Sequence, residues 1–347
     1  MGFIESVKIC FSKYFDFSGR ASRSEFWYFT LFLAIYTFII GLTVGVVLET
    51  RYPGTSKADI DYFFAQVSVQ EKSVDFKPTC GNILSGVAAA AIEMGLYPAK
   101  KGDTKVRIRA LNTGARITSI IQTDGQNVIY DGQAEIDGMS ETASPVVLTF
   151  KNVVGSSTGA LLPTGSFINE IDGITVTCMD VAMPMVIARA ESFGLTGYEL
   201  TKSLDKNSSF FSRMEAVRLK AGIMMGMGDV QNSVIPKFGL VARATNGGTI
   251  AARYFMPWST HPTMAVTGSQ CIASCVLTPG TVAEGMFSRP TKGPVKISLE
   301  HPTGLMDVIV DFSIIDGAFY HSSSSIVRSC RKLAQGDVFI PSDVWSQ

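Results

Sequence analysis

The sequence predicts an α+β fold of two similar halves, with one membrane-spanning helix ahead of them. Thirty-two glycines, spread among many Val, Ile and Thr residues, favour short strands joined by turns. A strand, a proline-containing loop and a helix of small residues follow one another around Cys80 and again around Thr267. An uncharged run covers residues 26–48. With 347 residues, the chain is long enough for two domains.

The uncharged run at residues 26–48 begins with Phe26-Trp27-Tyr28-Phe29. Its length of about 23 residues corresponds to roughly 34 Å of helix, which is enough to cross a bilayer. Basic residues gather before the run, so the positive-inside rule places the N-terminus in the cytoplasm. They are Lys8, Lys13, Arg20 and Arg23, against Arg51 closely after it. A buried helix of a soluble domain is the alternative.

The entry to this run, over about residues 10–48, resembles a family of small bacterial inner-membrane proteins of unknown function. The resemblance rests on a Gly-Arg-x-x-Arg-x-Glu-aromatic-Trp signature that runs here from Gly19 to Trp27. The match covers only the first of that family's several membrane spans. Together with the uncharged run, it predicts a membrane segment over residues 1–49 and a single-pass inner-membrane location. Residues 50–58 then form a linker, in which Pro53-Gly54 is a turn signal.

The first half of the remaining chain, residues 59–180, has the pattern of a sheet with one helix. Alternating or continuous apolar runs, bounded by Gly, Asn and Asp, predict strands at residues 60–69, 106–111, 117–121, 146–153 and 174–181. Pro78 ends the preceding strand, and residues 79–82 supply cap and turn chemistry for a helix.

The second half, residues 181–347, repeats this logic. Apolar spacing predicts a helix at residues 185–193 that stops at Gly194, and another at residues 211–225. A strand follows at residues 249–255, and the segment from His261 to Gly268 leads into a small-residue helix that runs through Val276. Two helix starts that face each other across a cleft would hold a substrate with several carboxylates.

Cys80 is the candidate reactive group, because it lies at or beside a helix N-terminus. Free amides and the positive end of the helix dipole favour a thiolate there, and they also favour a bound carboxylate. A sulfur that exchanges a proton beside donors that hold an anion suits carbon-acid chemistry. The alternative is a buried structural cysteine in a helix of small residues.

Composition excludes several classes of function. The 30 basic and 30 acidic residues balance, so the chain lacks the electrostatic footprint of a nucleic-acid-binding protein. The six cysteines have neither metal-ligand spacing nor the density of a disulfide scaffold, so we expect no metal and a reducing compartment for the part that holds most of them.

Beyond residue 58, an ordered set of motifs resembles the PrpF family, which contains 2-methylaconitate cis-trans isomerase and 4-oxalomesaconate tautomerase. The motifs in the first half are Thr79-Cys80-Gly81-Asn82, Asn112-Thr113-Gly114, Gly155-Ser156-Ser157-Thr158-Gly159, Leu161-Leu162-Pro163-Thr164-Gly165, Asp172-Gly173-Ile174 and Cys178-Met179-Asp180. Those in the second half are Val181-Ala182-Met183-Pro184, Gly247-Gly248-Thr249, Ala265-Val266-Thr267-Gly268 and His301-Pro302-Thr303-Gly304.

The resemblance implies the diaminopimelate-epimerase fold, with two β-barrel halves that each surround a central helix and an active site between them. It also implies a cofactor-independent proton shift in an unsaturated tricarboxylic acid, of the 4-oxalomesaconate tautomerase type. Cys80 matches the family's active-site cysteine. The matching substrate-binding positions are Gly81, Asn82, Asn112, Thr113, Gly114, Thr267 and Gly268. His261 is a candidate donor to a substrate carboxylate, and a local bond to backbone is the alternative for its ring.

The family's opening Arg-Gly-Gly-Thr-Ser-Lys-Gly strand and its later Ser-x-Thr-Ser-Lys segment are not intact in this sequence. We therefore expect a first barrel that lacks its opening strands. The alternatives are a 2-methylaconitate isomerase, a catalytically inactive membrane-fused relic, and an amino-acid epimerase in which Cys271 serves the second helix start. The cysteines and the substrate class suit the cytoplasm, in contrast to the membrane segment. A homodimer is left open.

Overall fold

The computed structural model describes residues 58–67, 74–76, 80–256, 258–336 and 339. The chain divides into two compact units, and every described helix and strand belongs to the unit Ala58–Arg331. The membrane helix expected at residues 26–48 lies outside the described residues. Among the helices that are described, none has the length and apolar character needed to cross a bilayer.

Strands dominate the described unit. In chain order the strands are β1 (Ile60–Tyr62), β2 (Gln66–Val67), β3 (Val74–Asp75), β4 (Lys101–Ala110), β5 (Arg116–Asp124), β6 (Pro145–Lys151), β7 (Asn169–Ile171), β8 (Ile174–Asp180), β9 (Pro184–Arg189), β10 (Lys237–Arg243), β11 (Ile250–Phe255), β12 (Val295–His301), β13 (Gly304–Ile315) and β14 (Ala318–Ser329). The helices are α3 (Gly81–Leu84), α4 (Val87–Glu93), α5 (Thr201–Asp205), α6 (Ser208–Met224) and α7 (Val266–Leu277), with a 3-10 turn η1 (Ala190–Phe193).

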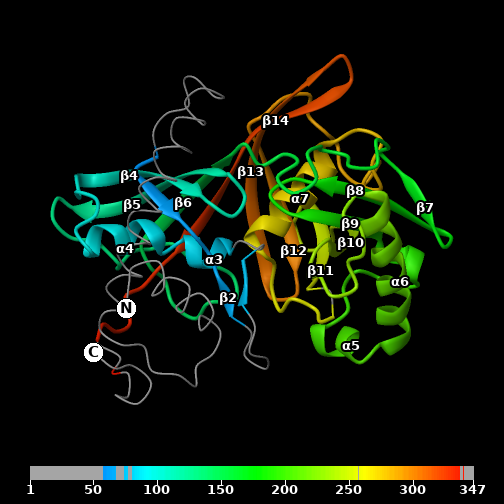
Figure 1. The fold of residues 1–347 in the computed structure, drawn as a ribbon, viewed down its shortest axis with the longest axis horizontal. Helices are drawn as coiled ribbons and strands as arrows, with labels where there is room; N and C mark the ends of the chain where they lie inside the picture. The colour runs from blue at the N-terminus through cyan, green and yellow to red at the C-terminus, as the bar shows by residue number, and fades with distance from the viewer. Residues whose placement is uncertain (1–57, 68–73, 77–79, 257, 337–338, 340–347) are drawn as a thin grey trace, which may run out of the picture. The chain divides into compact units, whose positions relative to one another are not determined.

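Twelve strands form one mixed sheet in the order β1-β4-β5-β6-β14-β13-β12-β11-β10-β9-β8-β7 (Figure 1). Most neighbours are antiparallel, whereas β1 with β4, β9 with β10, and β11 with β12 are parallel. From here on, the first half means β1, β4, β5, β6, α3 and α4, and the second half means β7 to β13 with α5 to α7. β7 and β8 precede the boundary expected after residue 180, but they count with the second half because β7 pairs with β8 and β8 with β9. β14 joins the two halves, because it pairs with β6 on one side and with β13 on the other.

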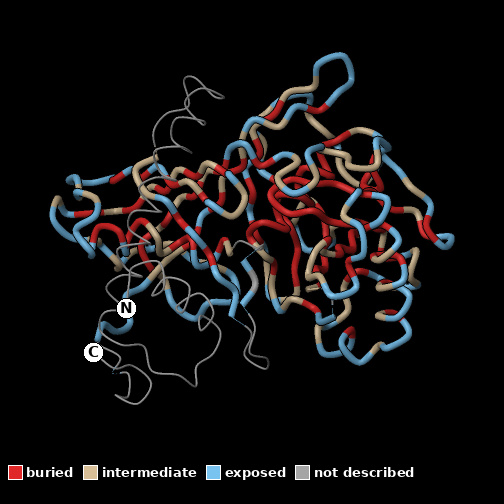
Figure 2. Tube along the Cα trace, in the orientation of Figure 1, coloured by how far each residue is buried: buried red, intermediate tan, exposed pale blue. Residues whose placement is uncertain are grey.

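The second half is organised around α7. All twelve residues of this helix are buried, and it contacts β8, β9, β11, β12, β13 and β14 (Figure 2). On the far side of β8 to β11, α6 covers a second apolar cluster that includes Phe210, Phe238 and Phe255. Cover on both faces explains why most residues of β8 to β11 are buried, and not only every second one.

The first half places its helices against a sheet with a regular inside and outside. β4 and β5 alternate between buried and more exposed residues, and their buried side includes Val106, Ile108, Ile117 and Ile121. At the edge, Asp59 and Asp61 accept bonds from the guanidinium groups of Arg107 and Arg109. Because these pairs are largely exposed, solvent screens them and they contribute little to stability.

The structure confirms the α+β class and most of the expected elements, but it corrects two of them. Residues 185–193, expected to be a helix, form β9 and the turn η1, which ends at Gly194 with φ 70°. Since β9 lies between β8 and β10 and is buried on both faces, its apolar run has no strand-like alternation. The strand expected at residues 60–69 is two short strands, β1 and β2, which belong to different sheets.

Candidate active site

Cys80 lies directly before α3, as the sequence predicts. Its backbone is extended, with φ −121° and ψ 106°, and its carbonyl accepts the first bond of the helix from the N–H of Leu84. The thiol is free and half-buried. Tyr62 reaches the same residue from β1, because its hydroxyl donates to the Cys80 carbonyl over 3.4 Å. Burial raises the pKa of Tyr62 to about 12, so this hydroxyl stays protonated and remains a donor.

The start of α7 matches the second predicted helix start. The first bond within α7 runs from the N–H of Ser269 to the Ala265 carbonyl, so the N–H groups of Val266, Thr267 and Gly268 have no partner inside the helix. With the positive end of the dipole of a twelve-residue helix, these groups favour a bound anion.

The two helix starts contact each other through glycine. A Cβ atom at Gly81 would lie 2.5 Å from the Cβ of Val266, so only glycine lets α3 begin against the first residue of α7. A Cβ atom at Gly268 would lie 2.1 Å from Cε2 of Tyr254, which is itself buried. Two of the glycines predicted as substrate-binding positions, Gly81 and Gly268, are therefore required for close packing.

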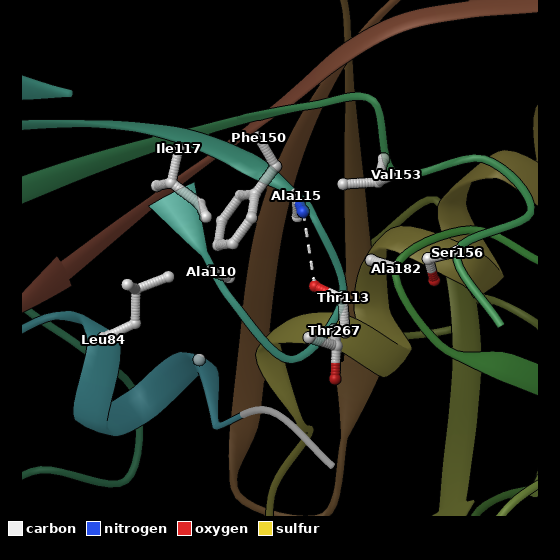
Figure 3. Close-up of a pocket in the computed structure, with 11 residues that line it drawn as sticks. Leu84, Ala110, Thr113, Ala115, Ile117, Phe150, Val153, Ser156, Ala182 and Thr267 are labelled. Atoms are coloured by element: carbon white, nitrogen blue, oxygen red, sulfur yellow. Dashed lines mark hydrogen bonds between the residues drawn. The ribbon is translucent and has the colours of Figure 1, made fainter. Parts of the chain in front are cut away.

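A narrow pocket, partly open to solvent, lies beside this contact, and its enclosed space is about the size of one water molecule. Figure 3 shows its lining from both halves. Its apolar wall consists of Gly81, Leu84, Ala110, Ala115, Ile117, Phe150, Val153 and Ala182, and its polar residues are Thr113, Ser156 and Thr267. None of these described lining residues is charged, so a carboxylate here would depend on hydroxyl and backbone N–H donors.

Asp180 holds the loop that brings Ser156 to the pocket. This carboxylate is fully buried, and it accepts bonds from the Ser157 and Thr158 N–H groups, each over 2.9 Å, and from the hydroxyls of Thr158 and Ser156. Burial raises the pKa of Asp180, whereas these four donors oppose the shift. Next to it, Ala182 lines the pocket at φ 60°, in the left-handed region that an alanine seldom adopts.

The remaining predicted site residues do not line the pocket: Cys80, Asn82, Asn112, Gly114, His261 and Gly268. The side chain of Asn82 is exposed, and Gly114 forms a turn with φ 70°. The amide of Asn112 is bonded to the backbone of Phe64 and Phe76. His261 takes the local arrangement considered above, since its Nδ1 accepts from the Thr263 N–H over 3.1 Å. Burial lowers the pKa of His261, so its ring favours the neutral form.

The cysteines of the interior differ from Cys80 in their surroundings. Burial raises the pKa of Cys178 to about 12 and that of Cys275 to about 11. Cys271 is also fully buried, and its Sγ donates to the Met179 carbonyl over 3.6 Å. Burial raises its pKa well above the usual range, so the thiol is held neutral inside α7. This arrangement agrees with a packing role for Cys271 and disfavours the two-cysteine epimerase.

Within the described part of the chain, no cluster of three or more His, Cys, Asp or Glu side chains is arranged to hold a metal ion. The chemistry that these residues supply is a thiol, several hydroxyl groups and two sets of helix-start amides. A proton acceptor beside fixed donors in a mostly apolar wall is the arrangement that stabilises an enolate-like anion.

The family model described as PrpF protein matches residues 42–341. This chain belongs to the PrpF family. The match begins ahead of the start near residue 59 that the motifs indicate, so it also covers residues outside the described part. The fold agrees with the family. The crystal structure of methylitaconate-delta-isomerase superposes with a TM-score of 0.70 at 25% identity, over 82% of this chain and 78% of that one.

Relatives in the PrpF family are similar over most of their lengths. YbhH of Escherichia coli K12 is 46% identical over 86% of this chain and 84% of that protein. The (4E)-oxalomesaconate Δ-isomerase of Novosphingobium is 39% identical over 86% of this chain and 82% of that protein. The 4-oxalomesaconate tautomerase of Pseudomonas putida is 39% identical over 83% of this chain and 79% of that protein. The predicted class, an isomerase or tautomerase of this family, is confirmed.

Sequence reasoning missed three residues of this PrpF-family site: Tyr62, Ser156 and Ala182. Ser156 and Ala182 belong to motifs that the sequence singled out, but nothing local in those motifs gives them a place in the pocket. The signal for Tyr62 was weaker still, because nothing in the sequence around a tyrosine at the end of a short strand indicates a bond to a residue 18 positions later.

Proposed function

We propose that this PrpF-family chain is a tautomerase that shifts a proton in 4-oxalomesaconate, without a cofactor. Two relatives that are 39% identical are named for 4-oxalomesaconate, and this observation carries the choice of substrate. In such a reaction a proton leaves a carbon α or γ to a carbonyl or carboxylate and another is added at a second position. The formula of the substrate therefore does not change.

Cys80 is the group that we assign to proton transfer. It immediately precedes Gly81, which lines the pocket, and the α3 start supplies amides close to the thiol. The hydroxyls of Thr113 and Thr267, together with the first amides of α7, would bind the carboxylates and the developing enolate oxygen. The apolar remainder of the wall strengthens these bonds by excluding water.

The experiment is solvent-proton exchange in D2O, followed by NMR, with 4-oxalomesaconate and 2-methylaconitate as the two substrates. Tautomerisation or exchange of 4-oxalomesaconate by the full-length protein in detergent supports the proposal. Turnover of 2-methylaconitate alone would assign the chain to the other branch of the family. A protein that melts cooperatively and exchanges neither acid would be the inactive relic.

For residues 26–48 we propose, on the uncharged run alone, that they anchor the chain in the inner membrane. Sedimentation with membranes that resists alkaline carbonate supports the anchor, whereas release by carbonate contradicts it. The same preparation, solubilised and measured by light scattering, would test the homodimer.

A further inference from the structure

We propose that Asn112 positions Cys80 and is not a substrate ligand. The proposal rests on the function assigned above, since it concerns how the reactive thiol is held in place. The sequence motif Asn112-Thr113-Gly114 suggested a substrate contact, but the side chain of Asn112 is turned to the protein's own backbone. Its neighbour Thr113 is the residue of this turn that lines the pocket.

The amide of Asn112 makes three bonds to two distant segments. Its Oδ1 accepts from the Phe64 N–H over 2.9 Å, and its Nδ2 donates to the Phe64 carbonyl over 2.8 Å. The same Nδ2 donates to the Phe76 carbonyl over 2.6 Å. A side-chain amide has two N–H donors, and both are engaged here, so none is left for a substrate carboxylate.

Both segments support Cys80. Phe64 follows β1, in which Tyr62 donates its hydroxyl to the Cys80 carbonyl, and the carbonyl of Tyr62 accepts from the Leu111 N–H over 2.8 Å. Phe76 lies four positions before Cys80, so the chain between them spans at most roughly 14 Å. The turn at Asn112 is thus bonded both to the end of β1, whose Tyr62 donates to Cys80, and to Phe76, which shortly precedes Cys80 in the chain.

The substrate-ligand alternative predicts a different arrangement. A ligand would have at least one free amide N–H directed at the pocket, whereas both N–H donors of Asn112 are bonded to backbone carbonyls. An amide that is bonded to three backbone groups instead holds the residues around Phe64 and Phe76 together. Loss of these bonds allows this part of the first half to open locally.

The test compares Asn112→Ala with Asn127→Ala, a matched control in which an exposed amide donates only to Asp124 within its own turn. We expect Asn112→Ala to lower kcat about tenfold or more while KM changes little, since misplacing a reacting group slows the chemical step. We also expect iodoacetamide to modify Cys80 about threefold faster or more, because local opening exposes the half-buried thiol. Peptide mass spectrometry reads this rate at Cys80, with Cys330 as the internal reference.

Two further variants keep the test decisive. Tyr62→Phe removes the direct bond to Cys80 and should also speed its modification, and combined with Asn112→Ala it should add less than the product of the two effects. Asn112→Ser, which retains one small hydrogen-bonding group, replaces Asn112→Ala if the latter does not fold. A raised KM with unchanged kcat and unchanged Cys80 modification would overturn the proposal. Since thiol modification needs no substrate, it decides the point even if neither acid is turned over.

Discussion

In the second half, α7 is a single helix whose twelve residues are all buried, whereas the first half supplies the short helices α3 and α4, which keep exposed residues such as Asn82, Ile83 and Ala90. Both halves bring a helix start to the same pocket. The difference shows that the start of α7 is fixed by packing on every side. The start of α3 depends on a few specific bonds, among them those of Tyr62 and Asn112.

The largest expected difference is in stability. Ile272 in α7 is fully buried, so Ile272→Ala should lower the free energy of unfolding by about 2–5 kcal/mol. Ile83 in α3 is 56% exposed, so Ile83→Ala should change it by no more than about 0.5 kcal/mol. Urea denaturation of both variants measures the contrast. Equal losses would mean that the first half is as tightly packed around its helix as the second.

The two helix starts also differ in their cysteines. We expect Cys80→Ser to lower turnover of 4-oxalomesaconate by about 100-fold or more, because it removes the proton-transfer group. Cys271→Ala should leave kcat within about threefold, since its buried thiol is a packing group. Both are measured by NMR under saturating substrate. Retained turnover in a folded Cys80→Ser protein would remove Cys80 from the chemistry.

Glycine substitutions sharpen the comparison further. Gly268→Ala would place its methyl carbon 2.1 Å from the buried ring of Tyr254, so we expect a loss of about 1–3 kcal/mol. At Gly86, which caps α4, the nearest atom to a new Cβ is the Ile83 carbonyl at 3.6 Å, an ordinary contact. Gly86→Ala should therefore be neutral or stabilising by up to about 1 kcal/mol. Thermal melts of the two variants should show that Gly268→Ala is less stable than Gly86→Ala. The reverse order of stability would contradict the packing described.

A pH-dependent effect concerns β14, the strand that joins the halves. Burial lowers the pKa of His321 from 6.5 to about 4, so the folded protein favours the neutral ring. Between these values the unfolded chain binds the proton more readily. Stability is therefore complete above pH 6.5 and falls as the pH is lowered toward 4. His321→Gln should lose less stability than the wild type between pH 7 and pH 5 in urea denaturation. Parallel losses in the two proteins would show that His321 is not the group responsible.

Much of the fold follows from local patterns. The runs at β4, β5, β6, β8 and β11, and the helices α6 and α7, have the apolar spacing and flanking turn residues from which they were predicted. The helix predicted at residues 185–193 was wrong, because a strand buried on both faces, such as β9, has no alternation of apolar and polar residues that distinguishes it from a helix. β14 was not expected, since its central serines show no apolar period and only pairing with β6 and β13 makes them a strand.

The candidate site was predictable to the same extent. Cys80 and Thr267 follow from helix-start chemistry, and the structure brings both helix starts to one pocket. The direction of the Asn112 amide could not be predicted, because it depends on backbone groups of Phe64 and Phe76, which lie 48 and 36 positions away. The same applies to Ser156, which reaches the pocket only because a buried carboxylate from another strand holds its loop.

The contact between Gly81 and Val266 has a consequence for how this protein varies. A methyl group at position 81 would meet the Val266 side chain at 2.5 Å, so the two positions form one steric unit shared by both halves. The nearest atom is the Cβ of Val266 itself, so in a combinatorial library a larger residue at 81 should survive selection only beside glycine at 266. Such compensated pairs would be a means of reshaping the junction between the halves without touching the reactive thiol.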